Sequence, residues 1–228
     1  MLSQRSILFY GDPHGEWRPL LAAVQENRPA AVVLLGDCDL DMPLRQKLAP
    51  VWELVPCWRW ICGNHDADTE AQFDHLFTDY PAGNLHAVLA GLAGHTVAGL
   101  GGIYKEKVWH PGKFNAPVFR TRDDMIRRTA RFDRWRGGVP RKHRDTIFYE
   151  DHETLGQLRA DILVTHEAPG CHPNGFVAID ELAQQMGVRL VVHGHHHVSY
   201  EGRTADGIPV RGLAQAEPWL LDPAKWWT

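Results

Sequence analysis

Five apolar stretches of this chain each end at side chains that could bind a metal ion or transfer a proton. In order, they end in Gly11-Asp12-Pro13-His14-Gly15, Gly36-Asp37, Gly63-Asn64-His65-Asp66, Thr165-His166-Glu167 and Gly194-His195-His196-His197. Carboxylate, imidazole and amide ligands without thiolate are typical of Mn²⁺, iron or Zn²⁺ in a catalytic site rather than of a structural zinc. The five endings together predict one metal centre assembled from distant parts of the chain.

Taken singly, each ending has an ordinary explanation. Asp12 or Asp37 could be a turn acid or a helix cap, and a lone His166 is more often a hydrogen-bonded core histidine than a ligand. The prediction of a metal centre depends on five such endings occurring in one chain. Residues two apart in a strand point the same way, so Asp12 with His14, and His195 with His197, can each converge on one small volume.

The apolar pattern indicates which elements must position these side chains. Short strands are expected at residues 7–10, 30–35, 58–62, 162–165 and 190–193, each followed by a glycine or a ligand. Helices are expected at residues 16–27, 43–54, 69–80, 122–135, 151–159 and 176–186. Hairpins are expected at residues 85–100 and 200–213. Strands alternating with helices, followed by hairpins, predict an α/β fold with mixed sheets, whose carboxyl ends collect ligands.

The ordered set Asp-x-His, Gly-Asp, Gly-Asn-His-Asp, His and Gly-His-x-His, from Ile7 to His197, resembles the calcineurin-like metallophosphoesterases. The resemblance implies a four-layer α/β/β/α sandwich of two mixed β-sheets flanked by helices. It also implies two divalent metal ions, with Mn²⁺ expected first and iron, Zn²⁺ or Ni²⁺ as alternatives. Seven ligands follow from it: Asp12, His14 and His197 for the first ion, Asn64, His166 and His195 for the second, and Asp37 as the bridge.

The same resemblance implies a reaction. A hydroxide bridging the two ions would attack phosphorus in line, and two metals can clamp both the attacking and the leaving oxygen. His65 is the implied proton donor to the leaving alkoxide, because imidazole titrates in the required range. Asp66 is expected to orient the His65 ring.

The chain departs from the Ser/Thr protein phosphatases of this family. Those continue the second motif with Asp-Arg-Gly, whose arginine binds phosphate, whereas here Gly36-Asp37 continues as Cys38-Asp39-Leu40-Asp41. They also usually have Glu where this chain has Asp66. A protein phosphatase is therefore disfavoured, and another group must bind the substrate phosphate.

Residues 104–150, the basic segment, hold 13 of the 24 Lys and Arg but only 6 acids, a net charge of +7, and we read them as a partly helical insertion. Guanidinium matches phosphate bidentately. The candidate phosphate ligands are Arg120, Arg122, Arg127 and Arg128. The alternative is that these arginines lie on a solvated helical face.

Composition bounds the remaining expectations. The 228 residues suit one domain, 1–228. No apolar run reaches the roughly 18 residues of a membrane span, and no signal peptide is evident, so we expect a cytoplasmic protein with no membrane partner. The four cysteines form no C-x-x-C pair and are expected to be reduced thiols.

The expected partner is a phosphorylated small molecule or a nucleotide, either monoester or diester. The net charge of −4 disfavours a general nucleic-acid binder. Two alternatives stay open. One is a non-catalytic interaction scaffold of the same fold, like the retromer subunit. The other is a nuclease or cyclic-nucleotide phosphodiesterase, in which the basic segment would supply the phosphate-binding surface.

Overall fold

A four-stranded sheet carries the first three ligand-bearing strands. The computed structural model describes residues 6–114 and 116–226 and places the strands of this sheet in the order β10-β1-β2-β3. Their bounds are Ile7–Tyr10 for β1, Ala31–Leu34 for β2, Cys57–Trp60 for β3 and Pro218–Leu220 for β10. β1, β2 and β3 are parallel, whereas β10 pairs antiparallel with β1. The ligand-bearing ends of the three parallel strands therefore share one edge.

A six-stranded sheet, ordered β4-β5-β6-β7-β9-β8, carries the other two ligand strands. Its strands are β4 (Leu89–Leu92), β5 (His95–Leu100), β6 (Ile162–Thr165), β7 (Leu190–His193), β8 (Tyr200–Arg203) and β9 (Pro209–Gly212). β5, β6, β7 and β9 run parallel, and β4 and β8 are antiparallel edge strands. Both sheets are mixed, as expected.

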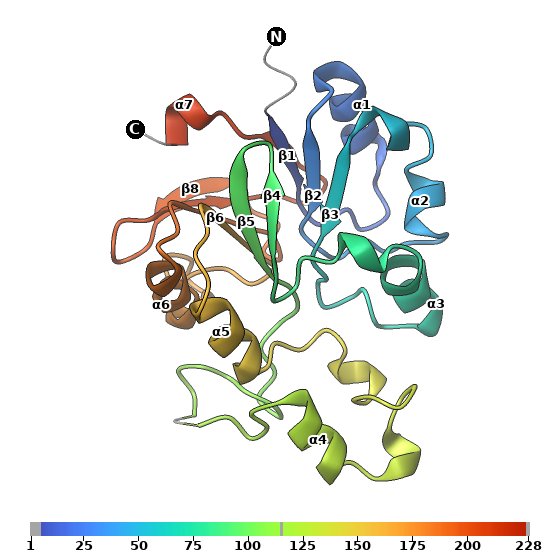
Figure 1. The fold of residues 1–228 in the computed structure, drawn as a ribbon, viewed down its shortest axis with the longest axis vertical. Coiled ribbons are helices and arrows are strands. Elements are labelled where there is room, and N and C mark those ends of the chain that lie inside the picture. Colours follow the sequence, from blue (N-terminus) through green and yellow to red (C-terminus); the bar gives the residue numbers. More distant parts are fainter. Residues whose placement is uncertain (1–5, 115, 227–228) are drawn as a thin grey trace.

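The two sheets pack face to face (Figure 1). Phe9 and Val33 of the small sheet and Val97, Val164 and Val192 of the large sheet belong to one fully buried cluster. Burial of both faces explains why these strands are continuous apolar runs rather than alternating ones.

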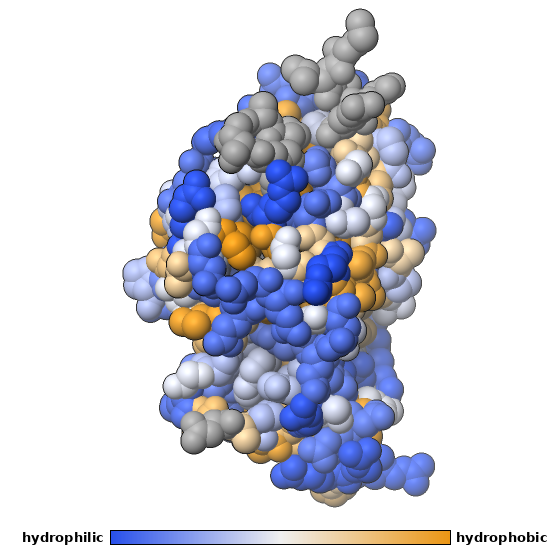
Figure 2. Space-filling model, turned by 60° about the vertical axis from the view of Figure 1, so that its left-hand side comes forward, coloured by the Kyte–Doolittle hydropathy of each residue, from blue (hydrophilic) through white to orange (hydrophobic). Residues whose placement is uncertain are grey.

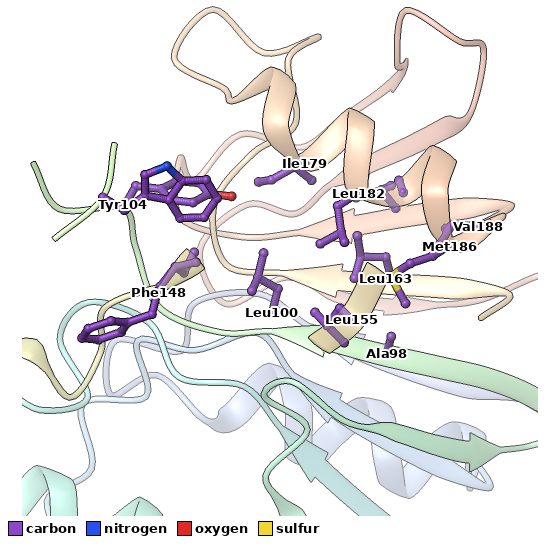
Figure 3. Close-up of a cluster of buried hydrophobic side chains, with 14 of the residues drawn as sticks. Ala98, Leu100, Tyr104, Phe148, Leu155, Leu163, Ile179, Leu182, Met186 and Val188 are labelled. Carbon is purple, nitrogen blue, oxygen red and sulfur yellow. The ribbon is translucent and has the colours of Figure 1, made fainter. Parts of the chain in front are cut away.

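Helices cover the outer faces. α1 (Arg18–Asn27), α2 (Leu44–Lys47) and α3 (Glu70–Phe73) lie against the small sheet. On the large sheet, side chains of α5 (Tyr149–Gly156) and α6 (Val177–Met186), such as Leu155 and Leu182, pack on Leu100 and Leu163 (Figure 3). The four-layer α/β/β/α sandwich is confirmed.

Several helices are shorter than the sequence predicts. The helix expected at 43–54 divides into α2 and a 3-10 helix, Trp52–Leu54, since the residue before Pro50 is disfavoured in a helical conformation. The helix expected at 69–80 begins with a capping box on Thr69, as predicted, but changes to a π-helix at Asp74–Thr78. β10 was not predicted, because a three-residue strand gives almost no periodic signal.

The basic segment forms a lobe below the two sheets in Figure 1 and contains little regular structure. α4 (Arg122–Arg128) ends seven residues before the predicted end at residue 135, and the 3-10 helices Arg131–Asp133 and Arg141–His143 follow. Figure 2 shows mostly hydrophilic side chains on this lobe, with small apolar patches between them. Its connection to the body lies close to the carboxyl ends of the strands.

Two further expectations concern the chain as a whole. The four cysteines are free thiols. Among residues 6–114 and 116–226, none of the helices combines the length and the apolar composition that a bilayer crossing requires.

Candidate metal centre

The predicted ligands come together from five loops, at the carboxyl ends of β1, β2, β3, β6 and β7. They form two groups, within each of which the ligand atoms lie within 4.8 Å of one another: Asp12, His14 and His197, and Asp37, His166 and His195. Asn64 joins the second group, with Oδ1 3.3 Å from Nε2 of His166. All seven predicted ligands are thus in the described site.

Asp37 lies between the two groups. Its Oδ2 is 3.6 Å from Nε2 of His14 in the first group and 3.5 Å from Nε2 of His166 in the second. The other oxygen, Oδ1, accepts a hydrogen bond from the backbone N–H of His65 at 2.9 Å. The carboxylate is therefore fixed in a position from which one oxygen faces both groups.

Five of the seven predicted ligand residues have left-handed backbone conformations. The φ angles are 34° at Asp12, 41° at His14, 51° at Asp37, 70° at His195 and 54° at His197. Non-glycine residues rarely adopt such angles, and they concentrate at functional sites where the surrounding structure enforces them. These side chains converge through sharp turns after the strands and not through the two-residue alternation that the sequence suggested.

Glycines before the ligands make room for them. A Cβ on Gly63 would lie 2.1 Å from Oδ1 of Asp37, and a Cβ on Gly194 would lie 2.3 Å from Oδ2 of Asp12. Any side chain at either position would displace a predicted ligand carboxylate. The glycines of these motifs therefore serve close approach of the backbone to the ligands.

Two ligand histidines are oriented by hydrogen bonds from the ring nitrogen that faces away from the site. Nδ1 of His14 lies 2.8 Å from Oδ2 of Asp39, whose other oxygen accepts from Nε2 of Gln72 at 3.1 Å. Nδ1 of His166 donates to the carbonyl oxygen of Leu35 at 2.7 Å, which directs Nε2 toward the second group. Such partners fix ring orientation in metal sites. Asp39 was not predicted from the sequence, although its place two residues after Asp37 was a signal for it.

The buried charges of the site favour a cation. Burial raises the pKa of Asp12 to about 6. Burial would also raise that of Asp37, but the charge and hydrogen bond of His166 bring the pKa of Asp37 below its usual range. Conversely, burial opposes the charge on His166, yet Asp37 and Asp12 raise its pKa to about 10. The two carboxylates thus stabilise positive charge where the groups meet.

The donor atoms present fit a divalent ion in each group. Nε2 of His14 and Nε2 of His197 face each other at 3.1 Å, and Nε2 of His166 and Nδ1 of His195 at 3.2 Å. Two imidazole nitrogens so placed have room for at most one proton between them, whereas a cation can accept both lone pairs. Carboxylates beside them supply the negative charge that such an ion requires.

His65 borders the site, but its predicted partner is wrong. The His65 ring is half-exposed, with its centroid 5.7 Å from that of His14. Asp66 was the predicted partner of the ring, but Nδ1 of His65 lies 2.7 Å from Oδ2 of Asp68 instead. The hydrogen bond of Asp68 is the main reason that the pKa of His65 is raised.

Asp66 instead joins two of the ligand loops. Its buried carboxylate accepts hydrogen bonds from the backbone N–H groups of Asp37 at 2.9 Å, Cys38 at 2.8 Å and Gly63 at 2.7 Å. It therefore holds the turn after β2 against the turn after β3. An acid that satisfies three buried amides positions the backbone at Asp37 rather than the ring of His65.

The four arginines that were candidates for binding phosphate are each paired with a nearby carboxylate of the protein. Arg120 bonds Glu153, and Arg127 and Arg128 lie 3.7 and 3.4 Å from the carboxylate of Asp124. Among the described contacts of these arginines, none reaches a predicted metal ligand. The structure supports the solvated-face alternative for these three.

Arg122 forms a structural ion pair with Asp151. Its guanidinium makes two hydrogen bonds to the buried carboxylate of Asp151, at 2.5 and 2.9 Å, and others to Glu150 and His86 at 2.9 Å. A guanidinium satisfied in this way has few donors left for a substrate. Arg122 therefore ties α4 to α5.

Arg141 is the arginine of the basic segment that reaches the loop after His65. Its Nη1 donates to the carbonyl oxygen of Ala67 at 2.8 Å and to that of Asp68. Asp68 in turn holds the His65 ring. Sequence reasoning missed this residue, because nothing in the local pattern distinguishes Arg141 from the twelve other cations of the segment.

Comparison with known proteins agrees with this site. Residues 5–199 match the family described as calcineurin-like phosphoesterase. An uncharacterized protein of Haemophilus influenzae is 38% identical over 217 residues, covering 92% of this chain and 94% of its own.

Two solved structures share the fold. TT1561 of Thermus thermophilus has a TM-score of 0.57 at 15% identity, covering 96% of this chain and 98% of that one. The phosphopantetheinyl hydrolase of Mycobacterium tuberculosis has a TM-score of 0.52 at 14% identity, covering 93% and 91%. The family match spans most of the chain and all seven predicted ligands, and the chain therefore belongs to the calcineurin-like phosphoesterase family.

Proposed function

We propose that this protein is a dinuclear metal-dependent hydrolase of phosphate esters, acting on a phosphorylated small molecule or a nucleotide. The observation that carries the proposal is the position of Asp37, with one oxygen 3.6 Å from His14 and 3.5 Å from His166. A single carboxylate oxygen facing two ligand groups suits two ions about 3.5–4 Å apart. Ligands of nitrogen and oxygen without thiolate favour Mn²⁺, with iron, Zn²⁺ and Ni²⁺ as further candidates.

The roles of the residues follow from their positions. Bound ions would supply Lewis acidity toward the phosphoryl oxygens and lower the pKa of the attacking water. His65, at the rim and held by Asp68, is placed to protonate the leaving oxygen. Asp39 and the carbonyl of Leu35 keep the rings of His14 and His166 turned toward the centre.

Metal content and turnover test the proposal together. Protein freed of metal with a chelator and reloaded with Mn²⁺ should hydrolyse p-nitrophenyl phosphate or its bis ester, and elemental analysis should give about two ions per chain. Asp37→Asn should lose both metal and turnover. Asp41→Asn removes an exposed acid paired with Lys47 and is the matched control, which should change neither.

The scaffold alternative makes the opposite prediction. A non-catalytic relative would bind metal weakly or not at all and would hydrolyse no ester in a panel of monoesters, diesters and nucleotides. Retention of all seven ligands in one place favours hydrolysis. Reloaded protein that holds two ions and remains inactive across that panel would contradict our proposal.

A further inference from the structure

A groove in the basic segment lies apart from the predicted metal ligands. It has a volume of about 570 Å³ and is bounded by α4, the chain before α4 and the 3-10 helix Arg141–His143. The side chains that matter here are three cations and three apolar groups: Lys107, Arg128, Lys142, Phe119, Met125 and Pro140. Polar and charged side chains line it together with apolar ones, and its volume is in the range of small-molecule sites.

Two of the cations have no acid to neutralise them. Within residues 6–114 and 116–226, neither Lys107 nor Lys142 has a carboxylate at ion-pair distance. Nearby lysines differ in this respect, because Lys105 pairs with Asp145 at 2.6 Å and Lys113 pairs with Glu106. The groove therefore presents two cations whose charge no neighbouring carboxylate offsets.

His143 lies beside the same lysines in the groove wall. It is buried in the groove wall, and its pKa is lowered to about 4, first by burial and then by the charges of Lys105, Lys142 and Lys107. The histidine is thus neutral at pH 7, where it can accept a hydrogen bond but adds no charge to the groove. Asp133 is the one carboxylate among the residues that line the groove.

The apolar part of the groove contains an aromatic ring with a cation over its face. The ring of Phe119 carries the guanidinium of Arg128 at 4.3 Å from its centroid, and Met125 lies buried beside them. Stacked aromatic and guanidinium planes bind the faces of bases. Positive charge next to such planes matches a ligand that combines phosphate with a heterocyclic ring.

We propose that this groove is a nucleotide-binding site, in which Lys107 and Lys142 bind phosphate and Phe119 with Arg128 contacts the base. The proposal goes beyond the hydrolase function, because none of these residues belongs to the metal groups. The groove is connected to the loop after His65, because Arg141, next to Lys142 in the chain, donates hydrogen bonds to the carbonyl oxygens of Ala67 and Asp68.

Binding to metal-free protein tests the proposal without any dependence on hydrolysis. Calorimetric titration of chelator-treated full-length protein with ATP should show one site per chain. Lys107→Glu combined with Lys142→Glu should weaken ATP binding at least about tenfold, since two attractive contacts become repulsive. Lys113→Glu reverses a charge outside the groove and should leave affinity within about twofold. Equal losses in both variants, or none in the double variant, would overturn the site.

A second titration separates nucleotide from phosphate alone. Phe119→Ala should weaken ATP binding severalfold but leave binding of inorganic tripolyphosphate unchanged, because only ATP carries a base. If tripolyphosphate binds as tightly as ATP and Phe119→Ala affects neither, the groove does not recognise nucleotides. Asp37→Asn should retain ATP binding, so a failed hydrolase proposal leaves this result intact.

Discussion

Nδ1 of His65 lies 2.7 Å from Oδ2 of Asp68, so the acid three residues later orients the ring of the proton donor candidate. The motif neighbour Asp66 points instead at three backbone amides. Asp68, in the loop after His65, thus supplies the carboxylate that orients the His65 ring. Arg141 of the basic segment holds this loop by donating hydrogen bonds to the carbonyl oxygens of Ala67 and Asp68.

Removal of the His65 ring should separate chemistry from metal binding. We expect His65→Ala to lower kcat about 10²–10⁴-fold while metal content stays unchanged, because the ring lies at the rim and general acid catalysis has this typical size. Asp68→Asn should lower kcat less and leave KM unchanged. Steady-state kinetics with elemental analysis check both. Undiminished turnover in His65→Ala would exclude it from the mechanism.

A methyl group on Gly194 should disturb the first metal group. Its Cβ would lie 2.3 Å from Oδ2 of Asp12, so Gly194→Ala must displace that carboxylate. We expect metal affinity to fall about 10–100-fold, as for other losses of ligand positioning. Gly91→Ala is the control, because nothing lies within 4 Å of a Cβ there. Competition with a chromogenic chelator measures both, and equal affinities would contradict the close approach.

Loss of Arg122 should destabilise the fold. Arg122→Ala removes two hydrogen bonds from the buried carboxylate of Asp151, which keeps His86 at 3.3 Å, and loss of one partner of a buried charge typically costs about 3–5 kcal/mol of unfolding free energy. Arg127→Ala removes an exposed arginine 3.7 Å from Asp124 and should change stability by less than about 0.5 kcal/mol. Urea unfolding of both variants decides the matter. A KM effect for Arg122→Ala at unchanged stability would restore its role in phosphate binding.

Acid should weaken the fold through buried neutral histidines. Burial lowers the pKa of His152 to about 4, and the hydroxyl of Tyr104 lies 2.6 Å from its Nε2. Because the unfolded chain binds a proton near pH 6.5 and the folded chain only near pH 4, stability is complete above pH 6.5 and falls below it. The slope is about 1.4 kcal/mol per pH unit for this group. In His152→Gln, unfolding free energies at pH 7, 6 and 5 should fall less steeply.

The sequence by itself determined the ligand-bearing strands and the family, and it predicted the ligand set. Apolar runs that end at glycine and a ligand predicted β1, β6 and β7 to the residue, because strands buried on both faces are continuous and end where the polar loop begins. The order of the motifs was sufficient for the family, and hence for the expected sandwich and its two ligand groups. Helix ends were predicted less well, since α2 stops before Pro50 and α3 and α4 are both shorter than their apolar pattern suggests.

Tertiary structure alone decided which groups serve the ligands. Asp39 meets His14 across 25 positions, His166 meets Leu35 across 131, and Arg141 meets Ala67 across 74. No local pattern encodes such pairings, because they depend on how separate loops are brought to one edge of two packed sheets. For the same reason the sequence could count the arginines of the basic segment, but only the fold assigned Arg122 to a buried carboxylate and Arg141 to the loop after His65.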